Sequence, residues 1–337
     1  IRGHALEARI YAEDANKGFL PSTGKLLHLS PPAESLNVRV DTGVEEGDEI
    51  TPHYDPMIAK LIVWDEHRDG ALARMRRALA DYRVVGVTTN IDFLSRLVAC
   101  PAFTSADLDT GLIERSRSFL FPEAAATPKE VLQLAAVGEL LYEAHQAREQ
   151  AKGSGDPWSP WHARDGWRLN LQANRMIGFR DGEALVEVQV AYGRDHWQLS
   201  VQGETVLARG RKLDGDRFAV ELDDRRLIAS VIAAGNKRHI FLNGQTWIVE
   251  RDDPLHLVEA GGAQGGGLTA PMPGKVVALL AQPGAKVEKG APLLILEAMK
   301  MEHTITAPKN GTVKAFCYAA GDQVADGASL VEFEEEK

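Results

Sequence analysis

An internal repeat constrains the fold of the C-terminal part of the chain. When the residues from Ala270 onward are shifted by 37 positions, small and aliphatic residues fall on identical residues. The matched pairs are Ala270 and Ala307, Pro271 and Pro308, Gly274 and Gly311, Val276 and Val313, Gly284 and Gly321, Val287 and Val324, Gly290 and Gly327, and Leu293 and Leu330. Valine- and leucine-rich runs punctuated by glycine are typical of short strands and turns. The repeat therefore predicts two similar β units packed face to face.

A single lysine stands at the joint of the two copies. Lys300 is the last residue before the second copy begins, and Met299 and Met301 flank it. We therefore expect Lys300 at the tip of a turn that joins the two halves, with its amine held in water. This placement makes Lys300 a candidate for covalent modification.

Composition excludes several classes of protein. The 337 residues suit two or three domains, and 44% hydrophobic and 26% charged residues are ordinary for a globular protein. A net charge of −10 argues against nucleic acid as a partner, because phosphate binding needs a basic face. Cys100 and Cys317 form neither a disulfide framework nor a zinc spacing, so a reducing compartment is expected. No apolar run approaches the roughly 18 residues of a membrane span. Because the chain starts at Ile1 without a methionine, we expect that an upstream part is missing.

Residues 1–118 are expected to form a mixed α+β region. Residues 57–64 are almost continuously apolar and predict a buried strand. Residues 65–81 predict an amphipathic helix, with apolar positions at Ala71, Met75, Ala78 and Leu79.

Residues 119–257 form the second predicted domain, which begins with a long helix. Thr127 as N-cap, Pro128 at the first helical position and Glu130 at N3 make a capping box, so a helix is predicted over about residues 128–150. From about residue 166 to 251 the pattern changes to alternating apolar and polar residues. The dipeptides Asp181-Gly182, Asp214-Gly215 and Asn243-Gly244 separate these runs as hairpin turns. A small antiparallel barrel or sandwich is predicted, and it and the helix must each bury a face.

A glycine-rich tract leads into the repeat. Residues 261–267 contain five glycines but lack the strand-to-helix context and the Gly-Lys-Ser/Thr ending of a phosphate loop. We interpret residues 258–268 as a flexible linker.

The segment around the lysine resembles a known motif. Residues 297–302, Glu-Ala-Met-Lys-Met-Glu, resemble the biotin attachment motif of biotin carboxyl carrier domains, and residues 270–274 resemble the strand that opens such domains. The resemblance implies covalent biotin on Lys300, with Ala298, Met299 and Met301 around it.

The same resemblance implies a fold. Residues 269–337 are expected to form an all-β flattened barrel or sandwich of the biotinyl/lipoyl type. A lipoyl carrier is the nearest alternative, although lipoyl domains usually place Asp and Ala beside their lysine. His303 is expected to be a surface residue beside the attachment turn.

The first region resembles the C-terminal subdomain of biotin carboxylases, which have an ATP-grasp fold. The segments that carry the resemblance, in order, are residues 3–14, 18–24, 38–41, 54–60 and 88–90. The resemblance implies that Arg39 is catalytic: it lies beside bicarbonate and the biotin ureido group, where a fixed guanidinium stabilises developing negative charge. From the residues alone, Arg39 reads as an exposed strand arginine paired with Asp41. The family's ATP loop, Mg²⁺ ligands and bicarbonate ligands lie upstream of this chain, which is therefore not expected to carboxylate biotin alone.

The middle region resembles the BT domain that joins the biotin-bearing subunit of acyl-CoA carboxylases to their carboxyltransferase subunit. Residues 156–160, 166–170, 301–305 and 330–336 resemble the methylcrotonyl-CoA carboxylase family more than the propionyl-CoA family. The implied protein is an α subunit of a biotin-dependent ligase of leucine degradation, in an α–β hetero-oligomer without nucleic acid or membrane. Its implied cofactors are biotin, ATP, Mg²⁺ and bicarbonate.

The resemblance also implies partners and leaves alternatives open. The partners are a carboxyltransferase β subunit, the acyl-CoA that this subunit holds, and a biotin protein ligase. Propionyl-, acetyl- and geranyl-CoA carboxylases, a non-catalytic carrier and assembly fragment, and a purely structural β protein are the alternatives. The expected location is the cytoplasm of a bacterium, which we favour, or the mitochondrial matrix of a eukaryote.

Overall fold

The computed structural model describes residues 2–123, 125–252, 267–270, 274–298, 301–325 and 327–335. The chain forms two compact units. One contains Ile1–Ala71, Gly86–Leu94 and Glu259–Lys337, and the other contains Leu72–Val85 and Ser95–Val258. The domain boundaries after residues 118, 257 and 268 stay a prediction.

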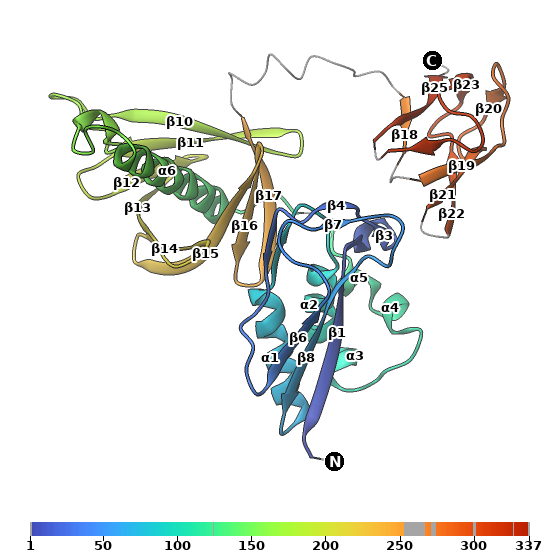
Figure 1. Cartoon of the computed structure of the whole chain (residues 1–337), viewed down its shortest axis with the longest axis horizontal. Coiled ribbons are helices and arrows are strands. Elements are labelled where there is room, and N and C mark those ends of the chain that lie inside the picture. Colours follow the sequence, from blue (N-terminus) through green and yellow to red (C-terminus); the bar gives the residue numbers. More distant parts are fainter. Residues whose placement is uncertain are drawn as a thin grey trace. The chain divides into compact units, whose positions relative to one another are not determined.

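A three-stranded antiparallel sheet organises the start of the chain (Figure 1). Its order is β1 (His4–Tyr11), β8 (Met57–Asp65) and β6 (Val38–Thr42), so β6 lies at an edge. In the central strand, Ile58, Ala59, Leu61 and Val63 are buried, which confirms the buried strand predicted at residues 57–64.

Short elements complete this region. The strands are β2 (Glu13–Asp14), β3 (Leu20–Pro21), β4 (Gly24–Lys25), β5 (His28–Ser30), β7 (Glu49–Ile50) and β9 (Arg83–Val85). The helices are α1 (Arg68–Asp81), α2 (Ile91–Ala99), α3 (Pro101–Thr104), α4 (Leu112–Arg115) and α5 (Arg117–Leu120), with a 3-10 turn at Ala15–Lys17. Helix α1 buries Ala71, Leu72, Met75, Ala78 and Leu79, which confirms the predicted amphipathic helix.

Eight strands close into an antiparallel barrel. They are β10 (Asn174–Asp181), β11 (Ala184–Tyr192), β12 (Trp197–Val201), β13 (Glu204–Lys212), β14 (Arg217–Leu222), β15 (Arg225–Ala234), β16 (Lys237–Leu242) and β17 (Gln245–Asp252). Each pairs with the next, and the pairing of Arg180 with Glu250 closes the ring. Asn243 and Gly244 both have positive φ, 50° and 77°, as a type I′ hairpin requires. The fold is therefore the barrel and not the sandwich.

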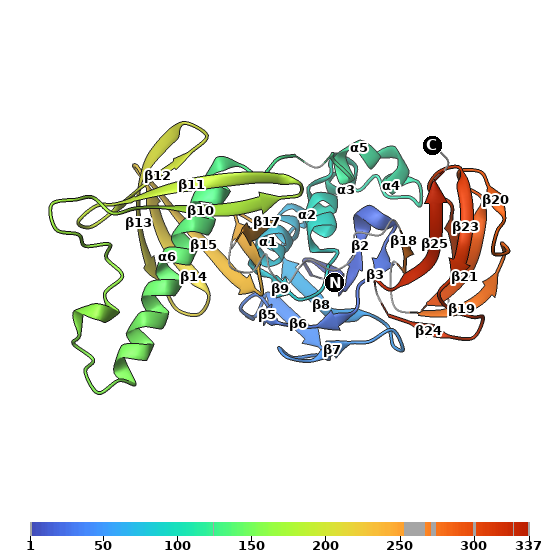
Figure 2. The same cartoon turned by 90° about the horizontal axis from the view of Figure 1, so that it is seen from above.

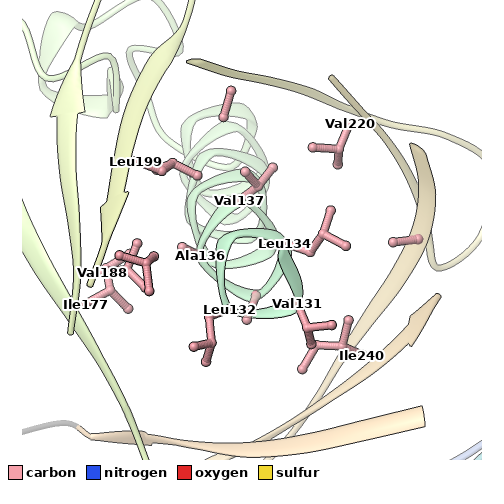
Figure 3. Close-up of a cluster of buried hydrophobic side chains, with 14 of the residues drawn as sticks. Val131, Leu132, Leu134, Ala136, Val137, Ile177, Val188, Leu199, Val220 and Ile240 are labelled. Carbon is pink, nitrogen blue, oxygen red and sulfur yellow. The ribbon is translucent and has the colours of Figure 1, made fainter. Parts of the chain in front are cut away.

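Helix α6 (Lys129–Lys152) lies inside this barrel (Figure 3). Residues 131–140 are all buried, because the barrel wall surrounds this part of the helix. Its aliphatic side chains meet inward-facing wall residues in one core cluster, which includes Val131, Leu134, Val137, Ile177, Val188, Leu199, Val220 and Ile240. The approach is close: a Cβ on Gly138 would lie 2.8 Å from Val231, and one on Gly210 would lie 2.8 Å from Val137. The predicted helix and barrel thus bury their apolar faces against each other.

The predicted capping box does not form. Pro128 is the N-cap and makes no side-chain cap bond. The Thr127 N–H donates to Asp181 Oδ2 at 2.7 Å, and Glu130 pairs with Arg225 at 2.7 Å. Contacts with the barrel therefore replace the local bonds that the capping prediction assumed.

Two four-stranded sheets form the repeat region (Figure 2). The first copy supplies β18 (Gly267–Thr269), β19 (Gly274–Leu279), β20 (Lys286–Val287) and β21 (Pro292–Ala298). The second supplies β22 (Met301–Thr306), β23 (Gly311–Phe316), β24 (Gln323–Val324) and β25 (Ser329–Glu335). The sheet orders are β18-β25-β23-β20 and β22-β21-β19-β24, so each sheet takes two strands from each copy. The prediction that each copy is a unit of its own is wrong, because the copies interleave.

Backbone hydrogen bonds repeat the same symmetry. Gly284 N donates to Val313 O and, 37 residues later, Gly321 N donates to Val276 O, both at 2.7 Å. Val276 and Val313 are both fully buried in the shared core. The domain is a pseudo-two-fold sandwich, and the fold class predicted for all three regions is confirmed.

Candidate functional site

The predicted attachment lysine lies between two paired strand ends. Strand β21 ends at Ala298 and β22 begins at Met301, and these two residues are the last pair of their antiparallel ladder. Met299 and Lys300 connect them and lie outside the described residues. The sequence length of two residues across a closing pair is that of a tight hairpin.

Strands β21 and β22 pack against the buried core of the sandwich. Leu294 and Leu296 of β21 are buried. His303 pairs with Leu296 in the ladder, so the two side chains share the core-facing side of the sheet. His303 is half-buried, and its Nε2 is buried without a hydrogen-bond partner among the described residues. The expectation of a surface histidine is therefore wrong, since the strand register turns this side chain inward.

The predicted catalytic arginine is exposed on an edge strand. Arg39 lies on β6 opposite Ile62 of β8, and its side chain is 67% exposed. Its Nε and Nη2 each lie 3.0 Å from a different carboxylate oxygen of Asp41, two residues along the same face. The guanidinium is thus held in a two-pronged pair with a carboxylate. Beside it lies a groove of about 550 Å³, lined by residues 34–39 and 62–64.

Sequence reasoning did not identify the role of Asn90, although it noted residues 88–90 as a motif. The Asn90 side chain is buried and accepts from the Tyr11 N–H at 3.0 Å. It donates to Arg9 O and Glu13 Oε1, both at 3.1 Å. The amide therefore ties residues 88–90 to the strand β1 motif, which is a structural role.

A second missed feature is an ionic network inside the barrel. Glu139 of α6 has a side chain that is 3% exposed, and it pairs with Arg238 of β16 and Arg251 of β17. One turn later, Glu143 accepts two bonds from Arg175 at 2.6 and 2.8 Å. Burial opposes ionisation of Glu143, but Arg175 and nearby arginines hold its pKa below the usual value. The sequence does contain a sign of this network, because Glu139 interrupts an otherwise apolar run of the helix.

The connection from α6 to the barrel exposes several large apolar side chains. Trp158, Trp161 and Trp167 are 91%, 87% and 75% exposed, and Leu169 and Leu171 are each 72% exposed. They lie within 14 residues of each other in the sequence, near a 3-10 turn at Pro160–His162. Exposed apolar side chains gathered in one segment are typical of an interaction surface.

Neither a metal cluster nor a membrane helix appears in the described part of the chain. No group of three His, Cys, Asp or Glu side chains there is arranged to hold a metal ion. No helix among the described residues combines the length and the apolar character needed to cross a membrane.

Three family descriptions match the chain in order. Residues 7–115 match "Biotin carboxylase C-terminal domain", residues 128–254 match "Methylcrotonyl-CoA carboxylase, alpha-subunit, BT domain", and residues 267–333 match "Biotin-requiring enzyme". The chain therefore combines the domains of a biotin-dependent carboxylase α subunit, and its relatives are enzymes of that class.

Individual proteins similar to this chain are α subunits of two acyl-CoA carboxylases. The chain is 39% identical to the mitochondrial methylcrotonoyl-CoA carboxylase subunit alpha of Dictyostelium discoideum, over 98% of this chain and 48% of that protein. It is 37% identical to the Mus musculus counterpart, over 100% and 48%. The mitochondrial propionyl-CoA carboxylase alpha chain of Homo sapiens is 32% identical over 99% and 46%. The chain thus spans about half the length of the curated relatives it matches.

Proposed function

We propose that this chain is the C-terminal half of a biotin-carrying α subunit of an acyl-CoA carboxylase that acts on 3-methylcrotonyl-CoA in leucine degradation. The observation that supports the proposal is that Ala298 and Met301, the residues on either side of Met299 and Lys300 in the sequence, pair at the end of the β21–β22 ladder in a pseudo-symmetric sandwich. The complete subunit would use ATP, Mg²⁺ and bicarbonate, and its ATP-binding part would precede residue 1.

Lys300 acts as a covalent anchor. Its Nζ forms an amide with biotin, and the positive charge of the amine is lost. Biotin supplies the nitrogen that carries a carboxyl group between two active sites. The chain's own contribution is a stable hairpin that a biotin protein ligase can recognise and a tether that keeps the group near both sites. Short flexible tethers give effective concentrations around millimolar. Of the predicted linker at residues 258–268, Gly267 and Leu268 belong to strand β18, so we propose residues 258–266, which lie outside the described residues, as that tether.

Arg39 is proposed to bind bicarbonate at the site where biotin is carboxylated. Its guanidinium already holds the Asp41 carboxylate with both prongs at 3.0 Å, which is the geometry that bicarbonate would need. Exchange of Asp41 for substrate would place the fixed charge beside the atoms where negative charge develops.

A matched pair of variants tests this role. Arg9 is also an exposed strand arginine, 59% exposed and paired with Glu7 at 3.4 Å. In the complete enzyme, Arg39→Lys should lower biotin carboxylation at least about a hundredfold with little change in ATP binding, because lysine cannot form the fork. Arg9→Lys should retain most activity. Near-normal turnover of Arg39→Lys would remove the proposed role.

The middle domain is proposed to bind the carboxyltransferase β subunit. The exposed tryptophans at 158, 161 and 167 support this, because aromatic anchors dominate the binding energy of many interfaces. The complex would be an α–β hetero-oligomer. Because the relatives above are mitochondrial, we propose the mitochondrial matrix as its location, with the bacterial cytoplasm as the alternative.

The acyl-CoA substrate is tested on the reconstituted α–β enzyme. Similarity to methylcrotonoyl-CoA carboxylase α subunits favours 3-methylcrotonyl-CoA, while the propionyl-CoA relative supports propionyl-CoA as the second candidate. We expect kcat/KM to be highest with 3-methylcrotonyl-CoA and carboxylation to vanish in Lys300→Arg. A higher kcat/KM with propionyl-CoA would overturn the substrate, and full activity of Lys300→Arg would overturn the carrier role.

A further inference from the structure

A pocket lies where α6 leaves the barrel. Its volume is about 420 Å³, and three segments line it. These are the second half of α6, the connection at residues 163–168 and the start of β10, with Tyr192 of β11 beside them. We call it the α6 pocket.

The α6 pocket carries an excess of positive charge. Its charged lining residues are Glu143, Arg164, Arg168 and Arg175. Both oxygens of Glu143 are already bonded to Arg175, and Arg251 lies 3.7 Å from Glu143 Oε1. The neighbouring carboxylate, Glu139, is likewise taken by Arg238 and Arg251. Glu139 and Glu143 therefore make their direct ion pairs with arginines of the barrel wall and not with those of the connection.

Arg164 and Arg168 make no direct contact with a carboxylate, although Arg164 lies near enough to Glu143 for its charge to help lower the pKa of that carboxyl. Neither forms an ion pair with any residue that the structure describes, and both are exposed. The nearest acid in sequence, Asp165, accepts the N–H of Trp167 at 3.0 Å and does not line the pocket. Two arginine forks thus border a polar cavity that has no free carboxylate.

The connection at residues 163–168 packs closely against strand β11 of the barrel. Gly166 has φ +68°, and a Cβ at this position would lie 2.4 Å from the Tyr192 ring. Only glycine allows this approach and this backbone conformation together. The close contact holds the neighbouring Arg164 and Arg168 at the rim of the pocket.

We propose that the α6 pocket binds an acidic segment of the carboxyltransferase β subunit, with one or two Asp or Glu carboxylates paired to Arg164 and Arg168. The proposal rests on the proposed function and adds to it the chemistry of the contact. Guanidinium forks match carboxylates in geometry, and the exposed Trp167 beside them offers an apolar face to the stem of the same side chains. Arginine and tryptophan are also the residues most enriched at binding hot spots.

The test measures the affinity of the full-length, biotinylated α subunit for the β subunit. At about 0.1 M salt, Arg164→Glu/Arg168→Glu should raise Kd at least about tenfold, because repulsion replaces attraction at two sites. The same variant should flatten the dependence of Kd on salt. Arg164→Lys/Arg168→Lys keeps the charges but loses the forks, so its Kd should rise only about two- to threefold.

Arg211→Glu is the matched control. Arg211 is exposed on β13 and does not line the pocket, so its reversal should leave Kd within about twofold. If Arg164→Glu/Arg168→Glu binds the β subunit as tightly as wild type, with the same salt dependence, the proposed role of the α6 pocket is wrong. The proposed binding of the β subunit by the middle domain is then unaffected. A wild-type α subunit that does not bind the β subunit overturns both.

Discussion

The buried ion pair of the barrel gives the sharpest stability prediction. Glu139→Gln keeps the shape of the side chain but removes the charge that Arg238 and Arg251 face. The Arg238 side chain is 8% exposed and donates its remaining bonds to Gly235 O and Lys237 O, so it cannot turn to water. Breaking a buried pair by removing one partner costs about 3–5 kcal/mol, and the retained amide oxygen favours the lower end.

Glu143→Gln is the matched control on the same helix. Glu143 and Arg175 are 28% and 29% exposed, so water can solvate the arginine that loses its partner. The expected cost is about 1 kcal/mol. The difference of about 2 kcal/mol corresponds to roughly thirtyfold in the equilibrium for opening the barrel.

Hydrogen exchange of peptides from β14 to β16 measures that opening in the intact chain, apart from the other domains. Glu139→Gln should accelerate exchange of these peptides by about two orders of magnitude, and Glu143→Gln by less than about tenfold. Equal acceleration by the two substitutions would refute the argument that burial sets the cost.

Three further predictions concern the two β domains. Burial, and to a lesser extent Lys237, lowers the pKa of His239 to about 4. The neutral ring is thus favoured in the folded state, so barrel stability should fall by about 1–2 kcal/mol between pH 6.5 and pH 4. His239→Gln should flatten this pH dependence in urea titrations. Gly138→Ala should lower barrel stability by about 1–2 kcal/mol, because its Cβ would lie 2.8 Å from Val231; a rise in the unfolding midpoint would contradict the close packing. Leu293→Ala and Leu330→Ala, at equivalent buried positions, should each cost about 2–5 kcal/mol and differ by less than about 1 kcal/mol, as measured by calorimetry. A large difference would argue against the pseudo-symmetry.

Local chemistry made part of the fold predictable. Asn243-Gly244 specifies its own turn, since both residues tolerate positive φ, and the apolar spacing of α1 specifies its buried face. The resemblance of residues 297–302 to an attachment motif predicts Lys300 as the attachment site, and this stays a prediction.

Long-range pairing was not predictable in the same way. Closure of the barrel depends on Arg180 meeting Glu250, 70 residues away, and no local pattern encodes that contact. Likewise, Glu130 pairs with Arg225 of the barrel and not with the start of its own helix. The 37-residue repeat looks the same whether its copies interleave or stack, so the sequence could not distinguish these arrangements. The catalytic role of Arg39 stays a prediction, because the exposed pair that it forms with Asp41 fits a structural role as well.

Biotinylation of Lys300 is the most direct test of the carrier proposal. The chain is produced with an active biotin protein ligase, and the intact protein and its peptides are weighed by mass spectrometry. The account predicts one biotinyl group, located on Lys300 and on no other lysine, and none in Lys300→Arg. An unmodified Lys300 under these conditions, or a lipoyl group in place of biotin, would contradict it.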